Sequence, residues 1–358
     1  MAFKLHFLLL ACCLLSHGSS AQDSIPDKSY SLAAYPVVFY LPETRLGFGG
    51  AGIWAFYFPD DDSRPSQIQT GIAYTLNKQV LLYLPYQVFW DDNRWIAKGE
   101  LGYYRYFYNY YGIGNQEATD YVEQYEVNYP RFRFNLLYQV LPQFYTGFRY
   151  WWDNYQIGSR EVGGQLISGT ITGGSGGVVS GLGLISIWDT RDHIFYSRKG
   201  IVLEATAFWN SKALGSDFNF SRFTIDASSF LSLNTNHILA FNLFAGSIAG
   251  EAPFNELMLL GGSKKARGFY EGRFRDKHLA LLQIEYRTKL KGRFGAVLFT
   301  SVGNVTPDLG HWAWKYNRYN AGAGLRYSLD KKEHINLRLD IGFGQQAIGY
   351  YFTIGEAF

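Results

Sequence analysis

Cysteine is almost absent from this chain of 358 residues, because its two cysteines, Cys12 and Cys13, both lie near the N-terminus. Beyond that stretch there is no run of about 18 or more apolar residues, which excludes a membrane protein built from helices. Charge of one sign is also scarce: the formal net charge is +3, and Lys and Arg form no block. These two features argue against a nucleic-acid partner.

Aromatic residues and glycine are abundant. Tyr and Phe number 28 each, Trp 9 and Gly 39, whereas proline is limited to 10. So many aromatic side chains must be buried somewhere, which excludes a disordered chain. Start and stop signals for helices are nearly missing, so the composition favours a β-rich fold.

The first 21 residues have the form of a secretory signal peptide. Lys4 gives a basic start, residues 5–15 form an apolar core, and small residues up to Ala21 suit cleavage before Gln22. The alternative is a lipoprotein signal, because Leu9-Leu10-Ala11-Cys12 would place a lipid on Cys12, although its apolar core would be very short. Cleavage after Ala21 would leave a chain without cysteine, held together by packing or by lipid.

One pattern recurs from residue 34 to the end. Apolar or aromatic residues alternate with small or polar ones, as in 279–290 (LALLQIEYRTKL), and then a turn follows. A period of two indicates strands with two different faces. We expect sixteen strands, at 34–42, 45–58, 67–76, 79–89, 92–107, 123–138, 142–157, 178–190, 200–213, 216–232, 236–248, 279–290, 293–303, 318–329, 333–344 and 348–358. Bacterial outer-membrane barrels also have an even number of strands.

The links between these strands differ in length. Every second link is mostly short and polar, whereas the alternate links include long ones at 108–123, 158–177, 250–278 and 304–317. Short turns on one side and long loops on the other are typical of a transmembrane barrel, whose interfacial girdles also account for the aromatic residues. A large soluble sandwich would alternate too, but it gives less reason for either feature.

We therefore predict an all-β protein in the outer membrane of a Gram-negative bacterium. Residues 1–21 are the signal peptide, 22–33 a short periplasmic segment, and 34–358 a 16-stranded antiparallel transmembrane β-barrel.

Three motifs go beyond a generic barrel. The link 250–278 contains Ala266-Arg267-Gly268-Phe269-Tyr270, the link 189–200 begins Asp189-Thr190-Arg191-Asp192, and the chain ends Phe352-Thr353-Ile354-Gly355-Glu356-Ala357-Phe358. With the segment from Tyr35 and with Tyr111-Gly112-Ile113-Gly114, they make the sequence resemble the barrel of the BamA/TamA-type outer-membrane protein family, also called the bacterial surface antigen family.

The resemblance implies that the sixth outer loop folds into the lumen, where acidic residues on the next two strands hold its arginine. Arg267 is then the lumenal loop lock, with Gly268 and Phe269 shaping the loop tip and Glu285 as its partner. Where the family commonly has a second acid, this chain has Ser301, which does not neutralise an arginine. The lock is therefore expected to be weaker, unless Asp340 or another lumenal acid substitutes.

Two further expectations concern the lock. Because a lumen is wet, we expect less than the roughly 3–5 kcal/mol lost when a fully buried ion pair is broken. The alternative reading of Arg267 is an ordinary solvated loop arginine.

The other two motifs are expected to serve structure and insertion. Asp189, Thr190, Arg191 and Asp192 are read as a periplasmic turn, in which Asp and Thr side chains bond to nearby backbone amides. The resemblance implies a C-terminal insertion signal, with the residues Phe352, Ile354, Gly355 and Phe358. Alternation predicts that Phe352, Ile354 and Phe358 share one face, towards lipid.

The functional expectation depends on a part that family members usually carry. POTRA modules or a patatin-like hydrolase domain usually precede the barrel, whereas only residues 22–33 precede the first strand expected here, too few for a domain. We expect an accessory in outer-membrane protein assembly or insertion, or in lipid handling. Its expected partners are outer-membrane lipids and lipopolysaccharide, and assembly-machine subunits or a periplasmic partner in trans.

A passive pore or structural barrel and an outer-membrane lipid hydrolase remain as alternatives. Gly173-Gly174-Ser175-Gly176-Gly177 formally matches a nucleophile elbow, but no helix follows it. A hydrolase would need a Ser–His contact near the bilayer edge, and sequence context pairs none of His193, His237, His278, His311 and His334 with a serine. No catalytic residue, metal site or cofactor is predicted.

Overall fold

The computed structural model describes residues 31–115, 121–160, 162–330 and 335–358. The predicted signal peptide, residues 1–21, and most of the segment 22–33 lie outside these residues. Among the helices of the described part, none is long and apolar enough to cross a membrane.

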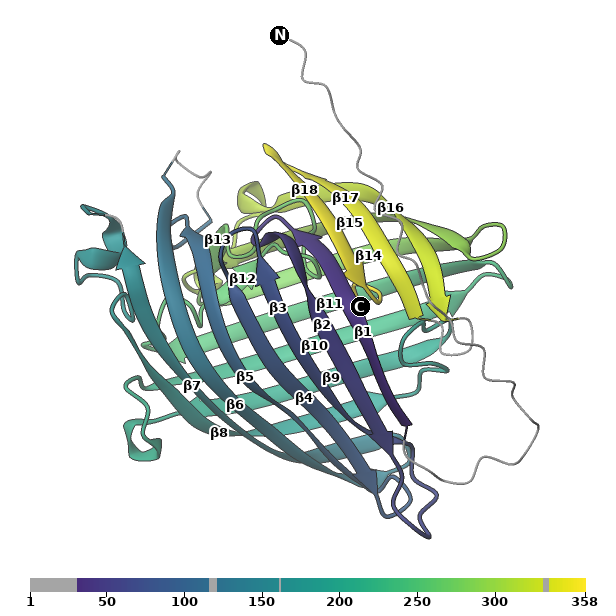
Figure 1. Ribbon diagram of the computed structural model, residues 1–358. Coiled ribbons are helices and arrows are strands. Elements are labelled where there is room, and N and C mark those ends of the chain that lie inside the picture. The colour runs from purple at the N-terminus through teal and green to yellow at the C-terminus, as the bar shows by residue number, and fades with distance from the viewer. Residues whose placement is uncertain (1–30, 116–120, 161, 331–334) are drawn as a thin grey trace.

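Sixteen antiparallel strands form one closed barrel, as predicted (Figure 1). They are β1 (Ser31–Leu41), β2 (Arg45–Phe56), β3 (Ser66–Thr75), β4 (Val80–Trp90), β5 (Trp95–Tyr110), β6 (Glu123–Leu141), β7 (Phe144–Arg160), β8 (Gly176–Asp189), β9 (Gly200–Asn210), β10 (Phe220–Ser232), β11 (His237–Gly250), β14 (His278–Lys289), β15 (Phe294–Thr306), β16 (Arg318–Asp330), β17 (Ile335–Gly344) and β18 (Ala347–Ile354). Each strand pairs with the strands before and after it in this order, and β18 closes the ring on β1.

The alternation that predicted the strands is visible in their burial. On β14, residues at odd positions from Leu279 to Arg287 are buried, whereas Leu282 between them is 41% exposed on the outside. Large apolar side chains such as Leu243 of β11 and Phe343 of β17 are likewise exposed on the outer wall. Outward apolar side chains are what a wall in contact with lipid requires.

The link between β11 and β14, residues 251–277, is the main departure from the predicted pattern. It contains a separate two-stranded sheet of β12 (Met258–Leu260) and β13 (Phe274–Asp276). Three-residue strands are too short to show alternation, so the sequence pattern missed them. Buried side chains of this link, including Phe254 and Phe269, share one apolar cluster with Tyr110 and Tyr125 of the wall.

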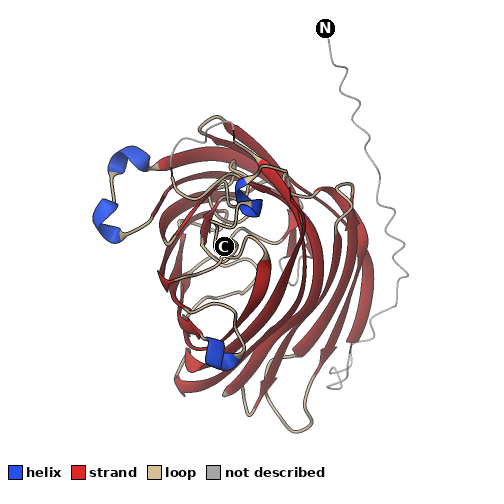
Figure 2. Cartoon of the chain, turned by 90° about the vertical axis from the view of Figure 1, so that its left-hand side faces the viewer, coloured by secondary structure: helices blue, strands red, loops and turns tan. Residues whose placement is uncertain are grey.

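Short 3₁₀ helices occupy three other links on the same side of the barrel as residues 251–277: η1 (Gln165–Ile167), η2 (Lys212–Leu214), η3 (Leu309–His311) and η4 (Trp314–Tyr316) (Figure 2). Three links on this side are short instead, at 42–44, 76–79 and 345–346, and they flank the junction of β1 with β18. The longer links on this side of the barrel therefore lie away from the junction of β1 with β18.

Candidate functional site

Arg267 lies at the centre of a buried charge cluster, with 1% of its side chain exposed. One guanidinium nitrogen donates to Glu285 of β14, and Nη1 donates to Oδ2 of Asp340 on β17 at 2.5 Å. The guanidinium also lies over the ring of Phe299, 3.6 Å from its centroid. A single side chain thus ties the link 251–277 to two strands that do not pair with each other.

Two glycines allow the backbone of the link to approach the wall closely. Gly268 has φ of +120°, and a Cβ at that position would lie 2.8 Å from the backbone nitrogen of Gly344. A Cβ at Gly342 would lie 2.5 Å from the carbonyl oxygen of Arg267. The N–H of Gly268 donates to the hydroxyl of Tyr351 on β18 at 2.8 Å. The loop therefore rests on the backbone of β17 and on a side chain of β18.

Three further arginines and one further carboxylate complete the cluster: Arg287, Arg326, Arg338 and Glu356. Arg287 donates to the second oxygen of Glu285 at 2.8 Å, and Arg326 donates to the second oxygen of Asp340 at 2.5 Å. Both carboxylates are fully buried and hold two arginines each through these bonds. Loss of either carboxylate would leave buried arginines uncompensated in a dry environment.

Ser301 does not contact Arg267 through an ion pair. Its hydroxyl bonds to the side-chain oxygen of Asn320 on β16, and the amide of Asn320 donates to the backbone carbonyl of Arg267. Asp340 supplies the second negative charge instead. The expectation of a wet site does not hold for these side chains, because Arg267 and both carboxylates have at most 1% exposure.

A second contact joins the link to the first hairpin. Glu43, in the turn between β1 and β2, is buried, and its Oε1 accepts a hydrogen bond from the N–H of Glu271 at 2.8 Å. Burial raises the pKa of Glu43 to about 7, and the nearby Glu271 carboxylate also raises it. Burial raises the pKa of Glu271 as well. Sequence reasoning missed this pair, because its members are 228 positions apart.

The Asp189–Asp192 motif begins at the last residue of β8 and forms local bonds. Asp189 accepts from the backbone N–H of Arg191 at 3.1 Å and pairs with its guanidinium at 2.7 Å. Thr190 Oγ1 accepts from the N–H of Ile201 at 2.9 Å, and Asp192 Oδ1 accepts from that of Arg198 at 2.9 Å. These bonds organise the link from β8 to β9, and its role in the cell stays a prediction.

The C-terminal residues do not all lie on one face. β18 ends at Ile354, which is 45% exposed on the outside, and Phe352 precedes it at an alternate position. The chain then turns at Gly355, where φ is +88°. The carbonyl of Phe358 accepts from Arg287 at 2.9 Å, and the Arg287 guanidinium lies 5.2 Å from the Phe358 ring. The prediction that Phe358 faces lipid is wrong, because this turn ends the alternation and directs the chain inward (Figure 2).

The junction of the first and last strands has little pairing. Among the described residues, β1 and β18 share one register pair, Tyr40 with Phe352. β1 and β2, by contrast, pair from Ser31 with Ala55 to Leu41 with Arg45. Backbone groups of two strands are therefore only sparsely paired across this junction, which we call the seam.

One serine and one histidine meet on the outer wall. Ser247 Oγ of β11 and Nδ1 of His278 on β14 are 2.8 Å apart, because these residues are register partners. They border an outer groove of about 520 Å³, lined by small residues such as Ala205 and Ala245 and bounded by Trp312. In the part of the chain that the structure describes, no second side chain hydrogen-bonds to His278, so the pair lacks the third member of a triad.

The serine of the glycine-rich motif is elsewhere. Ser175 is exposed in the link that precedes β8, and no histidine of the described residues hydrogen-bonds to it. The contact between Ser247 and His278 could be predicted from the register of β11 and β14, but only if the ends of both strands were known to the exact residue. Within the described ranges, no group of three His, Cys, Asp or Glu side chains could hold a metal ion.

Comparison with known proteins gives one family and several similar structures. A family model described as the Omp85 superfamily domain matches residues 69–358. The structure of BamA from Haemophilus ducreyi lacking POTRA domains 1-3 has 13% sequence identity and a TM-score of 0.61, and the match covers 92% of this chain and 70% of that one. No curated protein matches this sequence.

Two CdiB structures are similar to the same extent. CdiB from Escherichia coli has 10% identity, a TM-score of 0.61 and coverage of 93% of this chain and 63% of that chain. CdiB from Acinetobacter baumannii has 13% identity, a TM-score of 0.59 and coverage of 92% and 60%. At these identities the likeness establishes the barrel fold.

The Arg267→Ala variant is expected to lower the free energy of unfolding by roughly 3–5 kcal/mol, because Glu285 and Asp340 would each lose a buried partner. Urea unfolding in detergent micelles measures this change. Planar-bilayer recordings should also show a larger conductance, because the link would no longer be tied to β14 and β17. Arg293→Ala, at an exposed position in the opposite set of turns, serves as the control. Equal stability of the two variants would show that the cluster does not hold the link.

Stability should also depend on pH through Glu43. Its pKa is raised from 4.5 to about 7 in the fold. Protonated Glu43 therefore contributes its full stabilisation of the folded state below pH 4.5, and this contribution is lost as pH rises through about 7. The free energy of unfolding should fall by roughly 3 kcal/mol over this range. Glu43→Gln should flatten this part of the curve, whereas Glu251→Gln, at an exposed position of the same link, should not. Parallel curves of stability against pH for the unmodified protein and Glu43→Gln would contradict the assignment of this pH dependence to Glu43.

Proposed function

This chain belongs to the Omp85 superfamily, and from that premise we propose that it acts as an accessory in the assembly and insertion of outer-membrane proteins or in lipid handling. The family places the barrel in a bacterial outer membrane. Export by cleavage after Ala21 is part of the proposal.

The observation that carries the proposal is the seam. Elsewhere in the barrel the strands are paired along most of their length, but β1 and β18 share one register pair among the described residues. A sparsely paired strand edge is a template for another strand. A client strand could therefore add to β1 while it enters the membrane sideways from the lumen.

The inward-folded link speaks against a wide passive pore. The link 251–277 is anchored at Arg267 on one side and at Glu271 on the other, so it bridges β14, β17 and the first hairpin. A wide pore for diffusing solutes would instead have an open, water-filled lumen. An insertase needs them, because opening a seam without a plug would leak solutes across the membrane.

The proposed partners follow from the barrel. We propose outer-membrane lipids and lipopolysaccharide as partners of its apolar wall, and assembly-machine subunits or a periplasmic protein in trans as protein partners. Purification from native outer membrane in mild detergent, with identification of co-purifying proteins, tests this part. Recovery of the barrel alone would remove the support for a partner in trans.

A disulfide across the seam should abolish the proposed activity. The Tyr40→Cys, Phe352→Cys double variant joins register partners, and both native cysteines lie within the predicted signal peptide. In liposomes, insertion of a urea-unfolded client barrel should slow at least tenfold under oxidation and recover on reduction. Client insertion is measured as the change in gel mobility that a folded barrel shows when the sample is not heated.

A matched control places the disulfide in a fully paired part of the wall. Leu243→Cys with Leu282→Cys joins register partners of β11 and β14 whose side chains face outward. Oxidation of this control should leave client insertion unchanged. Equal rates for oxidised and reduced seam variants would refute an opening seam.

Ser247 and His278 favour a second candidate, an outer-membrane lipid hydrolase. The pair meets the requirement of a Ser–His contact near the outer ends of two strands, and the groove beside it has the small apolar lining that suits an acyl chain. Without a third polar partner on His278, a structural bond ranks ahead of catalysis.

A lipid assay separates these two readings of the pair. We expect the purified protein to release no fatty acid from phosphatidylethanolamine vesicles above the rate of the Ser247→Ala variant. Release that is lost in Ser247→Ala and retained in Ser175→Ala would establish the hydrolase instead.

A further inference from the structure

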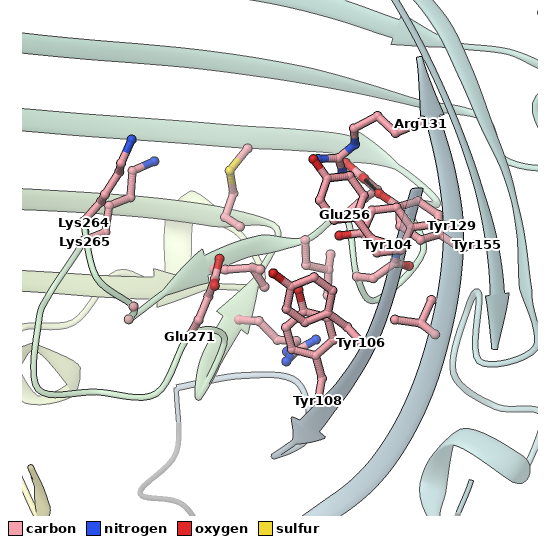
Figure 3. Close-up of a pocket in the computed structure, with 18 of the residues that line it drawn as sticks. Tyr104, Tyr106, Tyr108, Tyr129, Arg131, Tyr155, Glu256, Lys264, Lys265 and Glu271 are labelled. Carbon is pink, nitrogen blue, oxygen red and sulfur yellow. Dashed lines mark hydrogen bonds between the residues drawn. The ribbon is translucent and has the colours of Figure 1, made fainter. Parts of the chain in front are cut away.

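A cavity of about 560 Å³ lies between the link 251–277 and the inner face of β5, β6 and β7 (Figure 3). Its size is that of a site for a small ligand, for which about 300–1,000 Å³ is typical. Neither the Arg267 cluster nor the seam uses it. Its lining combines tyrosines from the wall with lysines from the link.

The wall of the cavity is a ladder of tyrosine rings. Tyr104, Tyr106 and Tyr108 follow one another at alternate positions of β5, with centroids 6.2 and 4.9 Å apart. Tyr129 of β6 stacks on Tyr104 at 5.0 Å, and Tyr155 of β7 follows at 5.1 Å. Because these rings stack on one another, and the guanidinium of Arg131 lies over Tyr104 and Tyr129, the ladder presents ring edges and hydroxyl groups to the cavity.

Opposite the ladder, Lys264 and Lys265 place two adjacent cations in the cavity (Figure 3). In the described part of the chain neither lysine forms an ion pair with a carboxylate. Lys265 instead lies over the ring of Phe244, 3.1 Å from its centroid. Burial lowers the pKa of both lysines, and that of Lys265 falls to about 8.

Carboxylates around the cavity offset only part of its positive charge. Asp226 acts on both lysines, and its Oδ1 accepts a hydrogen bond from the amide of Asn242 at 2.6 Å. Glu256 is held by Arg222 at 2.9 Å and by the Tyr155 hydroxyl at 2.6 Å. Asp153 is held by Arg131 and Arg133. Glu271 lines the cavity as well; burial raises its pKa, whereas the charges of Arg275 and Lys265 lower it. Cationic side chains therefore outnumber carboxylates in the lining, which holds Arg131, Arg133, Arg222, Lys264, Lys265 and Arg275 against Glu256 and Glu271.

Two smaller cavities continue from this one along the lumen. One of about 220 Å³ shares Arg222 and Lys265 with it, and another of about 330 Å³ shares Arg133 and Trp151. The latter reaches Gln67, at the end of β3 that lies away from the link 251–277. A ligand could thus enter from the side opposite the plug, which is the periplasmic side under the proposed function.

We propose that this cavity binds a small anionic saccharide, a sugar of one to three rings that carries carboxylate or phosphate groups. Lys264 and Lys265 would hold the anionic group, and the ring edges and hydroxyl groups of the tyrosine ladder would pack against the sugar rings. A polypeptide in extended form fits less well, because β5, β6 and β7 are paired on both edges and offer it no free backbone groups.

Isothermal titration of the purified full-length barrel in detergent tests the site with four probes. They are trigalacturonic acid, glucose 6-phosphate, neutral maltotriose and inorganic phosphate. We expect the two anionic sugars to bind at least tenfold more tightly than both maltotriose and inorganic phosphate. The anionic sugar that binds more tightly would show whether the site prefers a carboxylate or a phosphate group.

The other outcomes overturn the proposal. Equal affinity for maltotriose would remove the role of the lysines, and equal affinity for inorganic phosphate would mean a simple anion site without sugar recognition. No heat with any probe would mean that the cavity holds no such ligand.

Variants locate the binding. The Lys264→Gln, Lys265→Gln double variant should weaken the tighter anionic sugar at least tenfold, and Tyr106→Leu should weaken it several-fold with the charges intact. Lys277→Gln, on an exposed lysine of the same link, is the control and should bind as the unmodified protein does. Unchanged affinity in the double variant would refute the site, while gel mobility without heating verifies that each variant is folded. Client insertion is measured separately, so failure of this site leaves the seam proposal standing.

Discussion

The rest of the structure depends on one buried cation. Arg267 is shared by Glu285 and Asp340, which belong to strands on either side of two intervening barrel strands. Burying charge in this way is costly unless every partner is present. Here Glu285 and Asp340 hold two arginines each, although one nitrogen of each of the cluster's four arginines lacks a hydrogen-bond partner among the described residues. This arrangement fixes the position of the link 251–277. With the link in place, the tyrosine-lined cavity, the contact with Glu43 and the closed interior all follow.

The strands could be predicted from the sequence because a lipid-facing wall enforces a strict two-residue period. The sixteen expected strands correspond to the sixteen of the barrel, with ends displaced by a few residues. β10 shows why the ends are less certain: residues before Phe220 continue the alternation in the sequence, but Ser211 caps η2 and Gly215 adopts a positive φ. Local hydrogen bonds therefore shorten the strand, and a period of two does not reveal them.

The candidate site was only partly predictable. The family motif pointed to Arg267 and Glu285, and the serine in place of the second acid made Asp340 or another lumenal acid a candidate. Arg326 and Glu356 also belong to the cluster, but nothing in their local sequence distinguishes them from surface charges. Contacts such as Glu43 with Glu271, or Ser247 with His278, depend on loop path and register, which are properties of the whole barrel.

The sparse pairing of β1 with β18 has a consequence for how the molecule is made. In a closed barrel every strand is stabilised by hydrogen bonds to two neighbours. The pair of strands with the fewest hydrogen bonds is the last to form and the first to separate. The newly made chain would thus pass through an open, curved sheet whose two edges are the first and last strands. The amides of those strands would exchange with solvent fastest, and their edges would stay accessible after the other fifteen junctions had closed.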